Sequence, residues 1–248
     1  ILLTGATGFL GSCLFKALLS KGHKVVILKR STSDIWRIKG LFKQCVSYDV
    51  DTQPLELAFE EQHIDVVIHT ACHYGRNTDP MEQVVESNLI FGLQILDACI
   101  KFNTCTFFNT DTLLQKHLNI YTLSKKQFVE WLKQASKKIQ VVNLKLEQMY
   151  GPKDDSTKLV PWVLSQLEAN VSEIKLTLGE QKRDFIYIDD VVSAYLTVLE
   201  KSPGLGKFNE FDVGTGQLLA VKSFLKNLKK IYEASFGLSN TSLVFGAI

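Results

Sequence analysis

Tyr121 and Lys125 are the residues whose types and spacing most clearly suggest chemistry in this sequence. A tyrosine and a lysine four positions apart lie on the same face of a helix. There a lysine ammonium can lower the pKa of the phenol, so that the tyrosine donates or accepts a proton during a reaction. Of the seven tyrosines, only Tyr121 has a lysine at the fourth following position. The pair therefore predicts an acid–base site.

Three glycines near the N-terminus, Gly5, Gly8 and Gly11, have the spacing of a phosphate-binding turn between a strand and a helix. Glycine permits a tight turn and a close approach of the backbone to phosphates, and a helix N-terminus favours anions. An ordinary glycine-rich turn is the alternative. We predict a dinucleotide site, and with the Tyr–Lys pair it indicates a nicotinamide-dependent redox enzyme. The other turn residues assigned to the cofactor are Thr7, Phe9 and Leu10.

The end of the next strand indicates which dinucleotide is used. A site for NAD usually has an acidic residue there for the ribose hydroxyls. This chain has Lys29, Arg30 and Ser31 instead, and no carboxylate until Asp34. Cationic groups suit a 2′-phosphate, although a solvated basic turn is the alternative. We therefore predict NADP(H), with NAD(H) still possible, and expect Arg30→Ala to weaken NADPH binding more than NADH binding.

Other candidate residues follow the later strands. Asp49 and Val50 are predicted to meet the adenine edge, and Thr70 and Ala71 to line the dinucleotide. Ligands bind beyond the carboxyl ends of parallel strands, so the residues after the fifth strand are expected to face the substrate. Thr110 and Asp111 supply a hydroxyl and a carboxylate there, with turn capping as the alternative, and we assign Asp111 and Thr112 to substrate binding.

Four further polar positions have no clear signal. Asn88 lies within a helical pattern and is as readily a surface residue as a site residue. His73, Tyr74 and Arg76 follow the fourth strand, where they could touch substrate, but single residues on a loop are more often on the surface.

Apolar strand-like runs alternate with helical patterns through the first two thirds of the chain. Strands are expected over residues 1–4, 24–28, 45–48, 65–69, 105–109 and 140–146, and helices over 11–20, 84–102, 121–137 and 189–199. This alternation predicts an α/β fold of the Rossmann type, a doubly wound parallel sheet. We expect residues 1–150 to form the dinucleotide-binding domain, with 184–214 packing back on it. Residues 151–183 and 215–248 then form a smaller substrate-binding part.

Composition excludes several classes of function. The 248 residues are 46% hydrophobic and 22% charged, which is ordinary for a globular protein. A net charge of +2 without a basic block gives no case for nucleic acid. The longest uninterrupted apolar runs are of strand length, so no membrane span is expected. Five scattered cysteines without a Cys-x-x-Cys pair favour reduced thiols in a cytoplasmic protein and predict no metal site.

The chain start is also informative. Residues 1–3 are Ile-Leu-Leu, which indicates a buried strand with no charged leader before it. There is no initiator methionine, so we expect a residue or two to precede Ile1 in the full protein.

Four segments together resemble the extended short-chain dehydrogenase/reductase family, which contains nucleotide-sugar epimerases, dehydratases and reductases. They are 4–11, 121–125, the Met-Tyr-Gly-Pro of 149–152, and the Arg-Asp-Phe-Ile-Tyr-Ile-Asp-Asp-Val of 183–191. The resemblance covers nearly the whole chain. It implies that Tyr121 is the general acid/base at the sugar oxygen, that Lys125 hydrogen-bonds the nicotinamide ribose, and that Thr110 hydrogen-bonds the reacting oxygen. It also implies that Arg183 meets the substrate's phosphates, unless it simply pairs with Asp184.

The turn after the fifth strand departs from one branch of that family. The 4,6-dehydratases carry Thr-Asp-Glu there, and the Asp–Glu pair eliminates water. This chain reads Thr110-Asp111-Thr112. Because the glutamate is missing, dehydration is not expected.

Three functions then compete. The first is NADPH-dependent reduction of a 4-keto group on a nucleotide-linked deoxysugar; the second is 4-epimerisation with tightly bound NAD; the third is a non-catalytic dinucleotide-binding regulator. Lys29 and Arg30 favour the reductase, and the basic run with Thr110-Asp111-Thr112 is similar to bacterial reductases that make CDP- or dTDP-linked deoxyhexoses for surface polysaccharides such as the O-antigen of lipopolysaccharide. Apolar stripes on the helices 84–102 and 121–137 suggest a homodimer, with packing onto the sheet as the alternative.

Overall fold

The computed structural model describes residues 1–76 and 79–248, and the chain divides into two compact units. The first contains Ile1–Leu146 and Ile188–Val213, and the second contains Glu147–Tyr187 and Gly214–Ile248. The chain thus leaves the first unit after the sixth strand of its sheet and returns to it for one helix and one more strand.

The first unit is built on a seven-stranded sheet in the order β10-β6-β5-β4-β1-β2-β3, and every neighbouring pair is parallel. The order reverses between β1 and β4, the position at which such sheets bind ligands. The expected α/β fold is confirmed, and the sheet has one strand more than the six expected. The strands are β1 Leu2–Thr4, β2 Val26–Lys29, β3 Val46–Asp49, β4 Val66–His69, β5 Thr106–Thr112, β6 Gln140–Leu146 and β10 Phe208–Val213.

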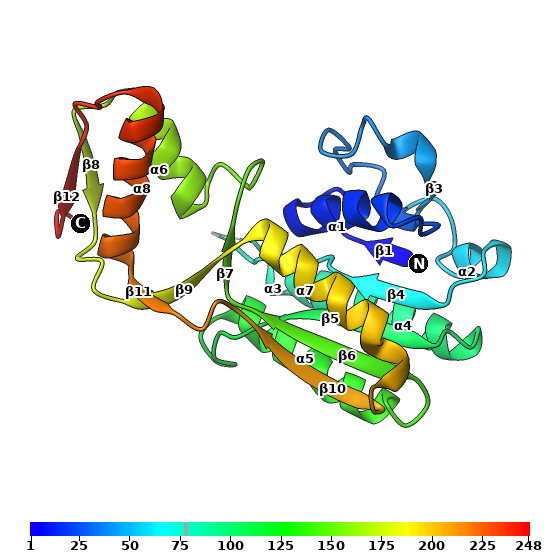
Figure 1. Cartoon of the computed structure of the whole chain (residues 1–248). Helices are drawn as coiled ribbons and strands as arrows, with labels where there is room; N and C mark the ends of the chain where they lie inside the picture. The colour runs from blue at the N-terminus through cyan, green and yellow to red at the C-terminus, as the bar shows by residue number, and fades with distance from the viewer. Residues whose placement is uncertain (77–78) are drawn as a thin grey trace. The chain divides into compact units, whose positions relative to one another are not determined.

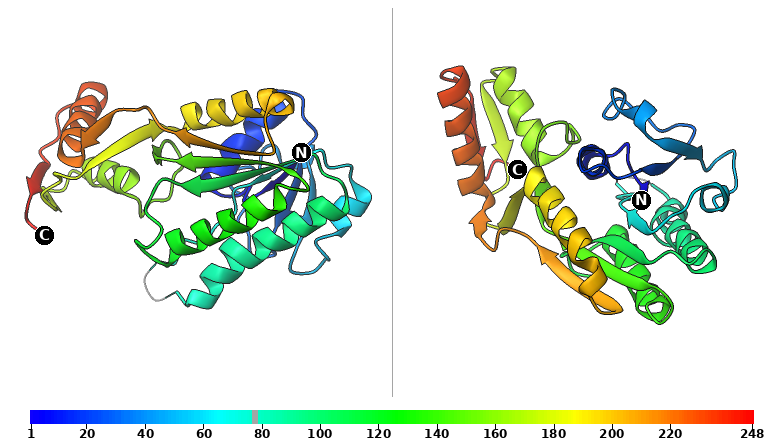
Figure 2. Two further views of the ribbon diagram at one scale, coloured as in Figure 1. Left: turned by 90° about the horizontal axis from the view of Figure 1, so that it is seen from below. Right: turned by 45° about the vertical axis from the view of Figure 1, so that its right-hand side comes forward.

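Helices cover both faces of this sheet. Figures 1 and 2 show α1 and α7 on one face and α4 and α5 on the other. The helical segments of the unit are α1 Phe9–Ser20, η1 Phe42–Gln44, α2 Leu57–Glu61, α3 Met81–Val85, the π-helical η2 Glu86–Ile90, α4 Phe91–Lys101, α5 Ile120–Ala135, α7 Ile188–Lys201 and η3 Ser202–Gly204. Asn119 caps α5 in a capping box with Thr122, so the helix that carries Tyr121 begins at a defined residue.

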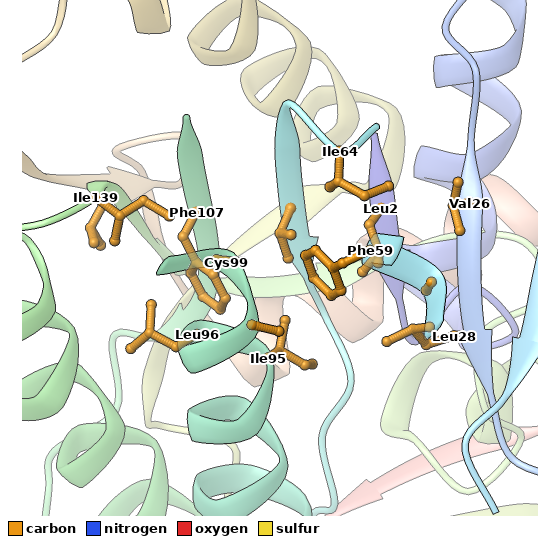
Figure 3. Packing of buried hydrophobic residues seen from close by; sticks show 14 of the residues in the cluster. Leu2, Val26, Leu28, Phe59, Ile64, Ile95, Leu96, Cys99, Phe107 and Ile139 are labelled. Atoms are coloured by element: carbon orange, nitrogen blue, oxygen red, sulfur yellow. The ribbon is translucent and has the colours of Figure 1, made fainter. Parts of the chain in front are cut away.

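A large hydrophobic core lies between the sheet and α4 (Figure 3). Leu2 and Phe107 are on strands, and Ile95 and Cys99 on the helix; all four are completely buried. Strands buried on both faces have near-continuous apolar sequences rather than alternating ones. This packing fixes the strand ends, and therefore the residues that follow them.

α3, η2 and α4 are continuous and form one helix, Met81–Lys101, of 21 residues. By length and composition it is the one helix of the described chain that could cross a membrane. Val84, Ile95 and Cys99 on it are buried against the rest of the unit, as in a core helix of a sheet layer. The sequence predicted a helix over residues 84–102, and the structure begins this helix earlier, at Met81. Its apolar residues recur at helical spacing rather than consecutively, so the segment did not stand out as a membrane span.

The second unit contains more regular structure than its irregular sequence pattern suggested. Its elements are β7 Gln148–Tyr150, α6 Leu159–Glu168, β8 Glu173–Leu176, β9 Lys182–Tyr187, β11 Leu218–Ala220, α8 Val221–Phe236 and β12 Ser242–Phe245. β9 pairs with β7 in parallel and with β11 antiparallel, and β12 pairs in parallel with β8. A separate core joins α6 and α8 through Val163, Leu167 and Leu225. Its strands are short and its helices mix apolar with polar residues, so the hydrophobic periodicity of the sequence is weak. For this reason the sequence did not predict these elements.

Candidate active site

The loop between β1 and α1 has the geometry of a phosphate cradle. Gly5 has a φ of +67°, and a Cβ there would lie 2.7 Å from the backbone nitrogen of Ala71. A Cβ on Gly11 would overlap the carbonyl oxygen of Gly5. Both positions therefore require glycine, one for its backbone conformation and the other because the first turn of α1 is packed against the loop.

The N-terminus of α1 has no side-chain cap, because Gly8 is its N-cap residue. An uncapped helix start suits an anion. Arg37 also reaches this loop: its Nη1 donates a hydrogen bond of 3.3 Å to the carbonyl oxygen of Thr7, and its guanidinium lies over the Trp36 ring. The cradle and the uncapped helix fit a dinucleotide pyrophosphate. Sequence reasoning missed Arg37, which no glycine or strand-end pattern marks.

The two cations at the end of β2, Lys29 and Arg30, have different surroundings. Lys29 is paired with Asp49 at 3.2 Å. The same carboxylate accepts a hydrogen bond of 2.9 Å from the Ser31 hydroxyl. Desolvation opposes ionisation of Asp49, but hydrogen bonds from Ser31, the Asp51 backbone and Lys29 lower its pKa. Arg30 is exposed, and its guanidinium has no hydrogen bond or ion pair with another described residue. Of the two cations predicted here, Arg30 is thus the one without a protein partner.

β1 and β4 are joined at their carboxyl ends by side chains. The Thr4 hydroxyl accepts hydrogen bonds of 3.2 Å from the backbone nitrogens of Thr70 and Ala71. It therefore donates its own proton to Nδ1 of His69, 2.9 Å away, which leaves the ring proton on Nε2. That nitrogen is buried without a hydrogen-bond partner, and Phe107 and Phe128 are among the rings around it. The network fixes Thr70 and Ala71 beside the glycine loop.

Tyr121 lies in the first turn of α5, and Lys125 one turn further on. Lys125 is fully buried, and its ammonium has no hydrogen bond or ion pair with another described residue. Burial lowers its pKa, while Cys72 and Asp111 oppose that change. Burial raises the pKa of Tyr121 well above 10.0, and Cys72 and Tyr74 add to the effect. The expected lowering by Lys125 is not found, because desolvation dominates at this phenol.

The loop after β4 is held over Tyr121 by a buried asparagine. Asn88 Oδ1 accepts a hydrogen bond of 2.7 Å from the His73 backbone, and its Nδ2 donates to the His73 carbonyl and to Ser124 on α5. Tyr74 then packs against the Tyr121 ring with centroids 5.1 Å apart. Asn88 is completely buried in the π-helical η2 and is therefore not a surface residue, whereas Tyr74 is 39% exposed although its ring contacts Tyr121.

Thr110, at the carboxyl end of β5, is held by a residue that the sequence did not reveal. Its hydroxyl oxygen is 2.6 Å from the hydroxyl of Tyr195, on α7. Tyr195 is only 1% exposed, and burial raises its pKa. It also acts electrostatically on Tyr121, so Thr110, Tyr121 and Tyr195 belong to one cluster.

Asp111 and Thr112 lie inside the unit rather than toward solvent. Asp111 is paired with Lys126 at 2.8 Å and accepts a longer hydrogen bond from Asn143. The hydroxyl of Thr112 accepts a hydrogen bond from the Leu114 backbone, and its carbonyl accepts one from Lys126. Substrate contact by these two residues stays a prediction that this placement does not favour.

Arg183 and Asp184 do not pair with each other. Asp184 accepts a hydrogen bond of 2.6 Å from the Thr215 hydroxyl and one of 2.7 Å from the Gly216 backbone. Arg183 is exposed, and its Nη1 donates a hydrogen bond of 2.9 Å to the carbonyl oxygen of the neighbouring Lys182. The aspartate of this motif therefore anchors a turn, and the arginine is available for an anion.

Three other predicted cofactor residues are mainly in the protein core. Phe9 and Leu10 form the buried first turn of α1, and Val50 packs against the large core. Among the described residues there is no group of three or more His, Cys, Asp or Glu side chains that could hold a metal ion.

The fold and site define a class of protein, and comparison with known proteins identifies it. Residues 1–214 match the NAD dependent epimerase/dehydratase family. The chain belongs to this family and is an NAD(P)-dependent enzyme. The resemblance of its motifs to the extended short-chain dehydrogenase/reductase family is thereby confirmed.

Individual relatives narrow the comparison. The chain is 34% identical over 265 residues to CDP-abequose synthase of Salmonella typhimurium, covering 100% of this chain and 85% of that protein. It is 32% identical over 244 residues to CDP-abequose synthase of Salmonella muenchen, and that match covers 95% of this chain and 81% of that protein. Among solved structures, UDP-glucuronic acid 4-epimerase of Bacillus cereus superposes with a TM-score of 0.83 at 22% identity, covering 99% of this chain and 86% of that one. UDP-glucose 4-epimerase of Thermotoga maritima superposes with a TM-score of 0.81 at 21% identity, and that match covers 97% of this chain and 84% of that one.

Proposed function

We propose that this enzyme reduces a 4-keto group on a nucleotide-linked deoxysugar with NADPH, in the synthesis of surface-polysaccharide precursors. The observation that carries this proposal is the match to the two CDP-abequose synthases along nearly the whole chain, together with an intact Thr110, Tyr121 and Lys125. The names of these relatives also favour a CDP-linked substrate.

The site residues have complementary roles in such a reduction. When bound, NADPH would supply the hydride that the carbonyl carbon accepts. Tyr121, kept protonated by burial, donates its proton to the carbonyl oxygen. Thr110 donates a hydrogen bond to the same oxygen and stabilises the charge that develops on it. Lys125 is a buried donor without a hydrogen-bond partner among the described residues, and it would hold the nicotinamide ribose hydroxyls.

The test of this function is NADPH consumption with CDP- and dTDP-linked 4-keto-6-deoxysugars, with the product identified by NMR. We expect the wild-type enzyme to be purified without cofactor and to oxidise NADPH only when a keto sugar is present. Tyr121→Phe should lower kcat by roughly 10²–10⁴-fold, since a positioned general acid contributes that much. NADPH affinity should remain within about twofold of the wild-type value, because packing of the ring is retained.

A 4-epimerase with tightly bound NAD is the alternative reaction. The solved neighbours with that activity are under 25% identical and support the fold alone. NAD that remains bound through purification, with interconversion of C4 epimers and no net NADPH oxidation, would establish the epimerase instead. A non-catalytic regulator would turn over no sugar nucleotide at all, and the intact Thr110, Tyr121 and Lys125 argue against it.

We also propose that the cofactor is NADP(H), bound at its 2′-phosphate by Arg30, with Arg37 beside the phosphate loop. Lys29 is already paired with Asp49, so Arg30 offers the unpartnered charge. Arg30→Ala should weaken NADPH binding by about tenfold or more, the value of one or two charge-assisted hydrogen bonds, and NADH binding by less than about twofold. Fluorescence titration measures both affinities. Lys24→Ala is the control, because it removes another exposed cation, shortly before β2. Equal losses for the two cofactors would contradict the assignment.

Two further proposals concern binding partners. We propose that the second unit is the substrate-binding part and that Arg183 binds the diphosphate. The guanidinium of Arg183 is exposed, while Asp184 is hydrogen-bonded within the turn at Thr215.

We also propose a homodimer formed through the α3–α4 helix and α5, which expose Met81, Val85 and Trp131. A cytoplasmic location stays a prediction from the five free cysteines.

A further inference from the structure

Tyr195 occupies the middle of α7, where its neighbours on the buried face are apolar. Ile188, Val191 and Val192 are buried on the same helix. A phenylalanine would fill such a site equally well, so the hydroxyl is not needed for packing. The hydroxyl of Tyr195 is 2.6 Å from Oγ1 of Thr110, and no other hydrogen bond of this phenol is formed with the described residues. A buried phenol normally finds a partner, and here the partner is the predicted catalytic hydroxyl.

The direction of this hydrogen bond matters for chemistry. Each hydroxyl has one proton to donate and can also accept. If Thr110 donated to Tyr195, it would have no proton left for the oxygen of a substrate. If Tyr195 donates, the Thr110 proton remains available. Burial favours the neutral phenol, which is the form that donates.

The geometry points to Tyr195 as a positioning residue: we propose that its hydroxyl donates to Thr110 Oγ1 and thereby directs the Thr110 hydroxyl proton toward the reacting sugar oxygen. This inference rests on the proposed function of Thr110. Without the phenol, Thr110 can rotate about χ1 and donate elsewhere, for example to a backbone carbonyl. Stabilisation of the developing oxyanion would then be weakened, although every residue that contacts substrate remains in place.

A double-mutant cycle tests the inference. Tyr195→Phe, Thr110→Val and the double variant are compared with wild type for kcat, KM, NADPH affinity and melting temperature. We expect Tyr195→Phe to lower kcat by about tenfold, a fraction of the loss when an oxyanion donor is removed entirely, with KM and NADPH affinity within about twofold. In the Thr110→Val background, Tyr195→Phe should cause no further loss of kcat.

Tyr48→Phe is the matched control, since Tyr48 is also buried and its hydroxyl bonds Glu61 at the far edge of the sheet. It should lower the melting temperature comparably without changing kcat. A loss of kcat by Tyr195→Phe that is the same in both Thr110 backgrounds, or no loss in either, would overturn the positioning role and leave the reductase function standing.

Failure of the proposed function would be seen first in the wild-type enzyme. If it epimerises sugar nucleotides instead of reducing them, the same cycle is measured on epimerisation, because Thr110 would serve the same C4 oxygen. If it does neither, the cycle is measured on urea unfolding midpoints. Additive effects of the two substitutions there would overturn the hydrogen bond itself.

Discussion

At the scale of single residues, the site depends on hydrogen bonds between residues that are far apart in the sequence. Tyr121, Lys125 and the glycines were predictable because their signal is a local spacing. Tyr195 and Arg37 were not, because their partners are 85 and 30 positions away. No local sequence pattern predicts such a contact. These contacts form only when α7 and the segment after β2 pack against distant parts of the chain.

His69 leads to a prediction about pH. Burial, with Lys125 as a lesser cause, lowers its pKa from 6.5 to about 3. The folded protein therefore keeps this ring neutral at mildly acidic pH, whereas the unfolded chain takes up a proton below its pKa of 6.5. The stability contributed by neutral His69 is complete above pH 6.5 and is lost as the pH falls toward 3.

We expect this linkage to cost roughly 2 kcal/mol of unfolding free energy between about pH 7 and pH 5. Urea denaturation of wild type and His69→Gln at the two pH values measures it. Glutamine can still accept from Thr4 but does not titrate, so the variant should lose less stability on acidification by about that amount. An identical loss in both proteins would show that His69 is not neutral in the fold.

At the scale of elements, the alternation of apolar runs and helical patterns predicted the first six strands of the sheet. It did not separate β10 from the surrounding sequence, because the polar residues Asn209, Glu210 and Asp212 interrupt the apolar run. Asn143 on β6 donates to Glu210 and accepts from Asn109 on β5, so polar side chains join three neighbouring strands. Such a ladder forms only after the strands are paired, and hydrophobic periodicity cannot predict it.

The contact between α1 and the glycine loop gives an element-scale prediction. Gly11→Ala should lower the unfolding free energy by roughly 1–3 kcal/mol, because the new methyl group overlaps the Gly5 carbonyl and pushes the helix away. NADPH affinity should fall by about tenfold or more, as measured by titration. Gly40→Ala is the control, with no atom within 4 Å of a Cβ, and should stay within about 0.5 kcal/mol of wild type. Equal behaviour of the two variants would contradict close packing at Gly11.

At the scale of the whole molecule, apolar surface suggests self-association. Trp131 on α5 is 54% exposed, and Met81 on α3 is 69% exposed. Large exposed aromatic side chains are typical of interfaces between subunits. The sequence suggested these helices as a dimer surface through their apolar stripes, while the inner part of each stripe packs into the unit's own core.

We expect wild type to sediment as a dimer and Trp131→Glu to sediment as a monomer, since a buried unpaired charge at an interface costs several kcal/mol. Analytical ultracentrifugation at micromolar concentrations gives the mass. Ile231→Glu on α8 is the control, a comparably exposed apolar residue outside the proposed interface, and it should leave the dimer intact. A wild-type monomer would rule out the proposed assembly.

The late return of the chain to form β10 has a consequence for synthesis on the ribosome. β6 is complete at Leu146, but its outer neighbour is not made until residues 208–213 have been translated. Until then the nascent sheet has an open edge, which can pair with another chain. Asn143 meanwhile lacks Glu210, its partner across that edge. A ribosome that stalls between these two points therefore displays a form of this protein that is prone to pair with other chains, and we expect chaperones to bind it during that interval.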